Sequence, residues 1–133
     1  GTRTDDLAQT LDIGITILEH AKVEKSIGMQ GVVLTAAGGA GREAAHIQYE
    51  TQRTQVAFGP RPRVHSIVYE NWRLSMYLGK CPNELFDLSN DPGEMVNLWC
   101  SAKHQDVKAR LIERLAELEI AAVDRVPLPT AQA

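Results

Sequence analysis

The chain has 133 residues, which is enough for one folded domain with a hydrophobic core but short for a complete large enzyme. Apolar residues make up 44% and charged residues 23% of it, so disordered and membrane-embedded classes are disfavoured. The formal net charge of −3 gives no electrostatic reason to expect nucleic acid or an anionic membrane as a partner.

The two cysteines leave the redox compartment open. Cys81 and Cys100 are too few for a disulfide framework, and the sequence allows either a bond between them or free thiols. The N-terminus has no signal-peptide pattern, and no apolar run is long enough to cross a bilayer. The localisation is therefore unknown from the sequence.

A helix is predicted over about residues 5–20. Thr4 is a suitable start, and Asp5 and Asp6 then fall in the first turn, where acids interact favourably with the helix dipole. These two aspartates also resemble a pair of metal ligands, but the helix-start interpretation is preferred. Apolar residues recur at helical spacing along this segment: Leu7, Leu11, Ile15 and Leu18.

Glycines mark the connection that follows. Gly28 and Gly31 predict a loop within residues 21–32, and residues 36–41 are rich in Gly and Ala. The glycine-rich residues 38–42 lack the Lys-Ser/Thr of a phosphate-binding loop. A flexible linker is therefore the preferred interpretation.

Strand patterns occupy the middle of the chain. Apolar and polar residues alternate over residues 45–50, which predicts a half-buried strand with Ala45, Ile47 and Tyr49 on its apolar side. Further strand segments follow at short intervals, and short turns between sequential strands require antiparallel pairing. A polar loop is predicted over 51–63. The strand segments after it are Val64–Glu70, Trp72–Leu78 and the Leu85-Phe86 region, and Glu70-Asn71 is the tip of a hairpin.

Residues 91–97 predict a capped turn. Asp91 can cap it, Pro92 fits its first helical position, and Glu94 can bond back to the cap. Asn97 suits the left-handed residue that ends such a turn. This turn leads from the last strand towards a C-terminal helix.

The C-terminal helix has the clearest pattern of all. Ser101 can cap it, and Pro127 and Pro129 follow its end. One side is apolar, and the opposite side carries charged residues, among which we count Glu119. The apolar stripe comprises Val107, Leu111, Ile112, Leu115, Leu118 and Ala122.

Together the elements predict an α+β fold, with a small antiparallel sheet of about four strands packed against a long C-terminal helix. We predict a single domain over residues 1–133. Its parts are a helix and linker (1–43), antiparallel strands (44–90), and a capped turn with the C-terminal helix (91–126).

Residues 84–98, ELFDLSNDPGEMVNL, resemble the end of the sulfatase family, where an E-L-Y-D-L strand is followed by D-P-x-E-x-x-N-L. The signature residues are Asp91, Pro92, Glu94 and Asn97. Three further segments resemble the family in the family's own order. They are 6–11 (V-D-L-x-P-T-L), 28–34 (G-x-x-G-x-S-L) and 64–77 (the hairpin V-R-T-x-x-Y-K-L-I).

The resemblance implies a C-terminal subdomain of the alkaline phosphatase superfamily, whose N-terminal helix comes from the junction to a catalytic domain. In that family a formylglycine, made from the first residue of C/S-x-P-x-R, attacks the sulfate ester, and a divalent metal, usually calcium, offsets the developing charge. No proline of this chain has Cys or Ser two residues before it. The nucleophile and the metal are therefore expected on the catalytic domain of the parent protein.

The implied function is an accessory domain of a sulfuric-ester hydrolase, which supports the catalytic domain and shapes the substrate pocket. Two alternatives remain: a phosphonate- or phosphate-ester hydrolase of the same superfamily, and a free-standing dimeric binding module. Without its partner domain, the chain is expected to dimerise or to exchange an element, because large bare apolar patches are rare.

Candidate site residues follow from the same reading. His46, Glu50 and His65 are possible pocket-rim residues, with exposed polar positions as the alternative. Arg61 and Arg63 are weaker candidates for contact with an anionic substrate. Trp72 and Trp99 are interpreted as core or interface anchors rather than stacking platforms for sugar, and the histidines and cysteines show no zinc spacing.

Overall fold

A computed structural model describes residues 6–34, 41–51, 61–79 and 82–123. The chain divides into two compact units, Gly1–Glu43 with Ile120–Ala133 and Ala44–Glu119. The assignment of residues 1–133 to a single domain stays a prediction. Some residues named in the sequence predictions lie outside the described ranges. They are Thr4, Asp5, Cys81, Pro127 and Pro129.

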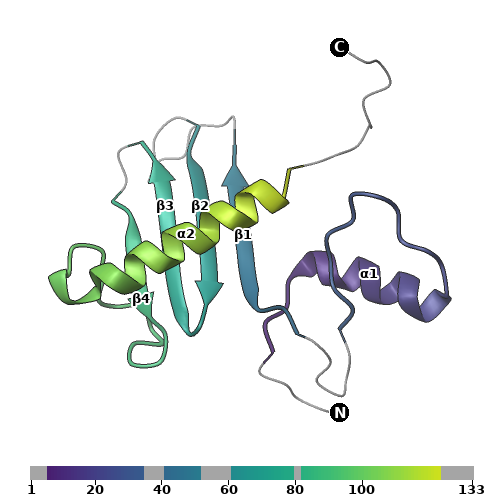
Figure 1. Cartoon of the computed structure of the whole chain (residues 1–133), viewed down its shortest axis with the longest axis horizontal. Coiled ribbons are helices and arrows are strands. Elements are labelled where there is room, and N and C mark those ends of the chain that lie inside the picture. The colour runs from purple at the N-terminus through teal and green to yellow at the C-terminus, as the bar shows by residue number, and fades with distance from the viewer. Residues whose placement is uncertain (1–5, 35–40, 52–60, 80–81, 124–133) are drawn as a thin grey trace. The chain divides into compact units, whose positions relative to one another are not determined.

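The second unit contains a four-stranded sheet in which sequential strands are neighbours and every pairing is antiparallel (Figure 1). This confirms the predicted antiparallel sheet. Glu70 and Asn71 both have positive φ, 49° and 62°, as a two-residue hairpin turn requires. The strands are β1 Ala44–Glu50, β2 Arg63–Tyr69, β3 Trp72–Leu78 and β4 Glu84–Asp87.

Helix α2, Gln105–Ala121, lies across one face of this sheet and supplies its core (Figure 1). A short 3-10 turn, η1 Ala102–His104, precedes it, and Ser101 stands at the capping position, but its side chain makes no capping hydrogen bond. Leu111 and Leu115 of the predicted stripe are buried, so the helix and its apolar side are confirmed. The buried cluster comprises Ala44, Ile67, Leu74, Leu85, Leu111 and Leu115.

The burial of β1 differs from the expectation. Ala45 is buried, but Ile47 and Tyr49 remain 46% and 45% exposed. His46 instead pairs in register with Ile67, so it shares the face that carries the core. The apolar stripe of α2 covers the face of the sheet that carries His46. The alternation within β1 could not show which of its two faces the helix covers.

Helix α1, Thr10–Ala21, begins later than predicted. Gln9 occupies the capping position, and its N–H donates to Asp12 Oδ2 at 2.7 Å. Asp6 lies before the helix, so its predicted role in the first helical turn is wrong. Leu7 forms an isolated β-bridge with Arg42 instead of joining the helical stripe. Reciprocal capping of Gln9 and Asp12 outweighs the acidic signal at residues 5–6.

Asp12 organises the first unit. Its side chain is fully buried and forms an ion pair with Arg42. Asp12 Oδ1 also accepts a hydrogen bond from the Val32 N–H at 2.9 Å, which holds the predicted loop against α1. Gly31 permits this approach, because a Cβ there would lie 2.5 Å from the Leu11 carbonyl oxygen. Among the described residues, no helix is long and apolar enough to span a membrane.

We predict that Asp12→Asn lowers the free energy of unfolding by about 3 kcal/mol at neutral pH, because it leaves Arg42 without its buried partner. Burial raises the pKa of Asp12, but the hydrogen bonds from Arg42, Val32 and Gln9 outweigh this effect and hold the pKa below the usual 3.8. The stabilisation that ionised Asp12 provides is therefore complete at pH values above 3.8, the pKa of an unfolded aspartate. It is lost as the pH falls through the lower pKa of the folded state. Urea denaturation across the acid range measures both effects.

The control is Glu19→Gln, which changes an exposed carboxylate on the same helix. We expect this variant to keep the acid sensitivity of the wild type, whereas Asp12→Asn loses less stability on acidification. Identical acid profiles for the wild type and Asp12→Asn would contradict the assigned role of Asp12.

Candidate functional site

One oxygen of Glu119 connects β1, β2 and α2 within the second unit. His46 Nε2 lies 2.8 Å from Glu119 Oε1, and His65 Nδ1 contacts the same oxygen. The register brings the two histidines together, since His46 pairs with Ile67, two residues from His65 on the neighbouring strand. The side chains of His46, His65 and Glu119 are 12%, 28% and 29% exposed, so the cluster is partly shielded from water.

Two further side chains orient this cluster. Gln48 Nε2 donates to Glu119 Oε2 at 2.7 Å, which fixes the second carboxylate oxygen. His65 Nε2 lies 3.1 Å from Glu50 Oε1. An ionised carboxylate only accepts hydrogen bonds, so each ring nitrogen of His65 that faces one must carry a proton.

The ionisation of the cluster follows from these contacts. Burial lowers the pKa of His65, but the hydrogen bonds to Glu119 and Glu50 outweigh it and raise that pKa above 6.5. Burial raises the pKa of Glu119, but hydrogen bonds from His65, His46 and Gln48 outweigh it and hold that pKa below 4.5. The pair therefore favours an imidazolium next to a carboxylate.

The cluster borders a cavity of about 510 Å³ between the sheet and α2. The wall is mostly apolar, and its polar members are Glu50, Arg63, His65 and Glu119. A mostly apolar pocket with a few convergent polar groups is typical of a ligand site. The apolar and aromatic lining comprises Met76, Tyr77, Leu78, Ile112, Leu115 and Ala116.

The structure brings the three predicted rim residues together. His65 contacts Glu50 directly. His46 and His65 contact the same oxygen of Glu119, which connects His46 to the other two residues. Arg63 lines the same cavity, whereas Arg61 is exposed outside it. The rim role itself stays a prediction.

Glu119 was not predicted as a site residue, because the sequence pattern assigned it to the charged, solvent-facing side of the helix. It follows Leu111 and Leu115 at intervals of four residues, so it continues the most buried line of α2. That spacing was the available signal. The partners of Glu119 were not predictable, because they come from two strands far away in sequence.

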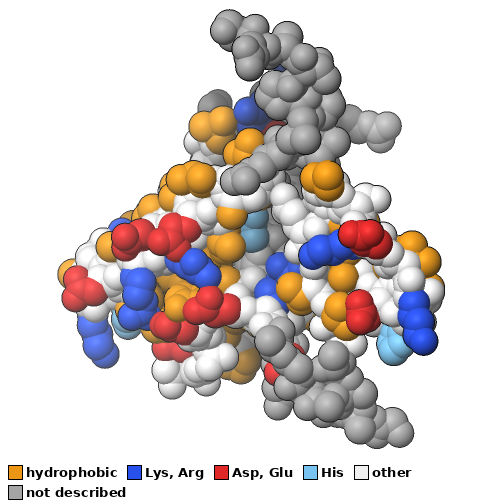
Figure 2. Space-filling view, turned by 45° about the vertical axis from the view of Figure 1, so that its right-hand side comes forward, with side chains coloured by type: hydrophobic (Ala, Val, Ile, Leu, Met, Phe, Trp, Pro, Cys, Tyr) orange, Lys and Arg blue, Asp and Glu red, His pale blue; other side chains and the backbone are white. Residues whose placement is uncertain are grey.

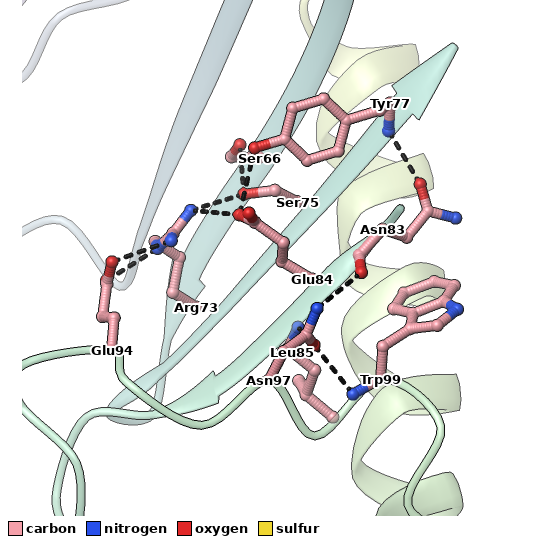
Figure 3. Close-up of polar contacts among 10 residues, drawn as sticks. All are labelled: Ser66, Arg73, Ser75, Tyr77, Asn83, Glu84, Leu85, Glu94, Asn97 and Trp99. Atoms are coloured by element: carbon pink, nitrogen blue, oxygen red, sulfur yellow. Dashed lines mark hydrogen bonds and ion pairs between the residues drawn. The ribbon is translucent and has the colours of Figure 1, made fainter. Parts of the chain in front are cut away.

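The signature residues 91–97 form a second polar region, next to β3 and β4 (Figure 3). Arg73 holds Glu94 through two parallel hydrogen bonds, Nε to Oε1 and an Nη to Oε2, each 2.7 Å long. Arg73 also donates to Ser75 Oγ at 2.7 Å and lies 4.9 Å from the centre of the Phe86 ring. The signature glutamate is thus anchored to the sheet.

The predicted capping by Glu94 is wrong. Its carboxylate faces Arg73, and its own backbone is left-handed, with φ 53°. Residues 91–97 form a turn without helix, so the predicted helical cap at Asp91 is wrong as well. Asp91 Oδ2 instead accepts a hydrogen bond from the Val96 N–H, five residues further on, at 2.8 Å. The guanidinium offers a bidentate partner that the backbone N–H of Asp91 cannot match.

Asn97 ties the turn to β4 instead of providing the predicted left-handed end (Figure 3). Its Oδ1 accepts hydrogen bonds from the N–H groups of Leu85 and Trp99, at 3.1 and 3.0 Å. Its Nδ2 donates to the Asn83 carbonyl oxygen at 3.0 Å. One side chain therefore joins β4 to the lead-in of α2.

The structure also places Asn90, the two tryptophans and Cys100. Asn90 donates to Asp87 Oδ2 at 2.8 Å within the turn after β4. Trp72 and Trp99 pack against the buried cluster as the sequence predicted. Cys100 is an exposed free thiol.

A family model described as "N-sulphoglucosamine sulphohydrolase, C-terminal" matches residues 1–121, so the chain belongs to this family of sulfatase C-terminal domains. This confirms the resemblance that the signature residues indicated. Among curated proteins, no match is found.

Solved structures show the same fold at low identity. The phosphonate monoester hydrolase of Agrobacterium radiobacter is 20% identical with a TM-score of 0.76, and the match covers 93% of this chain and 27% of that one. A protein solved with its substrate D-glucosamine-2-N,6-O-disulfate is 20% identical with a TM-score of 0.72, covering 98% and 28%. A putative sulfatase from Bacteroides thetaiotaomicron is 19% identical with a TM-score of 0.70, covering 93% and 27%. The chain thus spans little more than a quarter of these relatives.

We predict that a double-mutant cycle with Arg73→Ala and Glu94→Ala gives a coupling energy of about 1–2 kcal/mol, because the pair is bidentate and partly buried. The two side chains are 23% and 34% exposed. Urea denaturation of the two single variants and the double variant measures this energy.

The matched control is the pair Arg110 and Glu70, joined by one contact of 2.7 Å with side chains 53% and 48% exposed. We expect its coupling energy to stay below about 0.5 kcal/mol. Equal coupling in the two cycles would show that Glu94 contributes no more than an ordinary surface charge.

Proposed function

We propose that this chain completes a sulfuric-ester hydrolase as its C-terminal accessory domain. The observation that supports this proposal is the family match over residues 1–121. The chain spans 27–28% of three solved relatives, which is consistent with an accessory part of a larger enzyme. Its partner would be the catalytic domain of the same protein.

The chemistry would reside on that catalytic domain. No proline in this chain follows Cys or Ser at the spacing of the formylglycine motif. The catalytic domain would supply the formylglycine and a divalent cation, with calcium as the expected metal. This chain would support that domain and shape one wall of the substrate pocket.

A phosphonate- or phosphate-ester hydrolase is the second candidate. It is favoured by one specific observation, the match to a phosphonate monoester hydrolase at a TM-score of 0.76. Sulfuryl and phosphoryl transfer both place negative charge on oxygens around a central atom, so one accessory fold can serve either.

His46, Glu50 and His65 are the proposed contacts at the pocket rim. Glu50 and His65 line a cavity together with Arg63, and His46 is joined to His65 through Glu119. Cationic groups in the wall of a cavity favour an anionic ligand. Glu50 and Glu119 oppose this preference, so the rim would recognise substrate hydroxyl groups as well as charge.

Exposed apolar side chains support contact with a partner domain. Figure 2 shows hydrophobic side chains among charged ones on the face that it presents. On α1, Ile13 and Ile17 lie one turn apart and are 54% and 61% exposed, and Ile47 and Tyr49 are exposed on β1. Burial of these side chains by the catalytic domain would stabilise both parts.

We predict that the chain alone does not turn over chromogenic sulfate or phosphonate esters, with or without Ca²⁺, and that the full-length protein does. The coding sequence upstream of Gly1 is the first test, since the proposal requires an in-frame catalytic domain containing C/S-x-P-x-R. Rates with paired sulfate and phosphonate esters then separate the two hydrolase candidates. Turnover by the chain alone, abolished by one substitution in it, would refute the accessory role.

We also predict that the isolated chain self-associates, as a dimer or by exchange of an element, because its apolar contacts lack their partner domain. Ile13→Lys and Ile17→Lys together should shift the chain towards the monomer, with Glu19→Lys as a control on the same helix. Sedimentation velocity measures this shift. A wild-type monomer at tens of micromolar would contradict the expectation.

A further inference from the structure

We propose that His46, His65 and Glu119 form a binding site for one divalent transition-metal ion, with Zn²⁺ as its representative. One ligand atom from each residue lies within 4.8 Å of the others. Two imidazole nitrogens and one carboxylate oxygen form a set that zinc accepts in proteins, with a fourth position left for water or a ligand. This site is separate from the calcium expected on the catalytic domain.

The ligand atoms lie near the spacing that a first-row cation requires. Zinc binds imidazole nitrogen and carboxylate oxygen at about 2.0–2.2 Å, so two ligands of a tetrahedral ion lie roughly 3.4 Å apart. His46 Nε2 and Glu119 Oε1 are 2.8 Å apart, and small side-chain rotations would open the space that the ion requires. Both histidines project from paired strands, which fixes their separation before any ion arrives.

The surrounding contacts match the usual environment of a metal site. Histidine ligands commonly donate their second ring N–H to a carboxylate, which fixes the ring and strengthens the bond to the metal. His65 shows this arrangement, with Nδ1 facing Glu119 and Nε2 lying 3.1 Å from Glu50 Oε1. Gln48 holds the second oxygen of Glu119 at 2.7 Å. On metal binding, the protons on His65 Nδ1 and His46 Nε2 would leave these nitrogens, to solvent or to the other nitrogen of the same ring, and a nitrogen–metal bond would form at each.

The ligand types select the class of ion. Calcium and magnesium prefer six or more oxygen ligands, which these three residues do not supply. Imidazole favours zinc and its first-row neighbours. The fourth position would face the 510 Å³ cavity, since His65 and Glu119 both line it.

The test is calorimetric titration of the metal-free full chain with Zn²⁺ in a buffer without phosphate. We expect one Zn²⁺ per chain with micromolar or tighter affinity, and no comparable binding of Ca²⁺. His65→Ala and Glu119→Gln should each weaken zinc binding at least tenfold. Glu50→Gln, which changes only the supporting carboxylate, should weaken it about tenfold.

Matched controls are His20→Ala, an exposed histidine outside the cluster, and Glu117→Gln, an exposed glutamate on α2. Both should keep the wild-type affinity, and circular dichroism checks that every variant folds. Titration with Co²⁺ gives a second readout, because its visible absorption intensifies when it is four-coordinate. Glu50 is half exposed, so the Glu50→Gln variant remains informative if a core ligand variant fails to fold.

Absence of zinc binding by the wild type would overturn the proposal and leave an ion-pair cluster. Equal loss in His20→Ala and His65→Ala would show scattered surface binding and would also overturn it. The inference does not depend on the hydrolase proposal, because the titration measures metal binding by this chain alone. An inactive full-length protein that binds zinc at this site would refute only the hydrolase.

Discussion

The structure of the second unit depends on the burial of one helical stripe against one sheet face. Leu111 and Leu115 of α2 pack with Ile67, Leu74 and Leu85 of the strands, and all five side chains are less than 5% exposed. Removing such side chains from water contributes roughly 1.5–3 kcal/mol each. This contact fixes which face of every strand is inside, and therefore which polar side chains meet around its margin.

The two polar regions follow from that choice of face. Glu119 continues the buried line of α2, so it is held over His46 and His65 where the apolar contacts end. Arg73 alternates with the inward residues of β3 and therefore projects from the opposite face, where it holds Glu94 of the signature turn. In the first unit, a buried charge likewise finds its partners in distant segments. The Asp12 carboxylate accepts a hydrogen bond from the loop at Val32 and forms an ion pair with Arg42.

The two polar regions differ in their relation to the family signature. The turn at 91–97 belongs to the signature by which the sulfatase resemblance was found, and its side chains join β4 to the lead-in of α2. The histidine cluster is not part of that signature. Its partially shielded groups and the adjoining cavity therefore provide a chemical feature that the shared fold alone does not explain.

The sequence by itself determined the secondary elements of the sheet and α2, the antiparallel order and the family, because alternation, helical spacing, short turns and the signature are local patterns. It missed the start of α1, the partner of Glu94 and the role of Glu119. Each of these depends on groups brought together from distant positions: Asp12 with Arg42, Glu94 with Arg73, and Glu119 with two strands. Local periodicity specifies which side of an element is apolar. Only tertiary packing decides which charged side chains end up at its edge, since a buried or half-buried charge must find its partner in space.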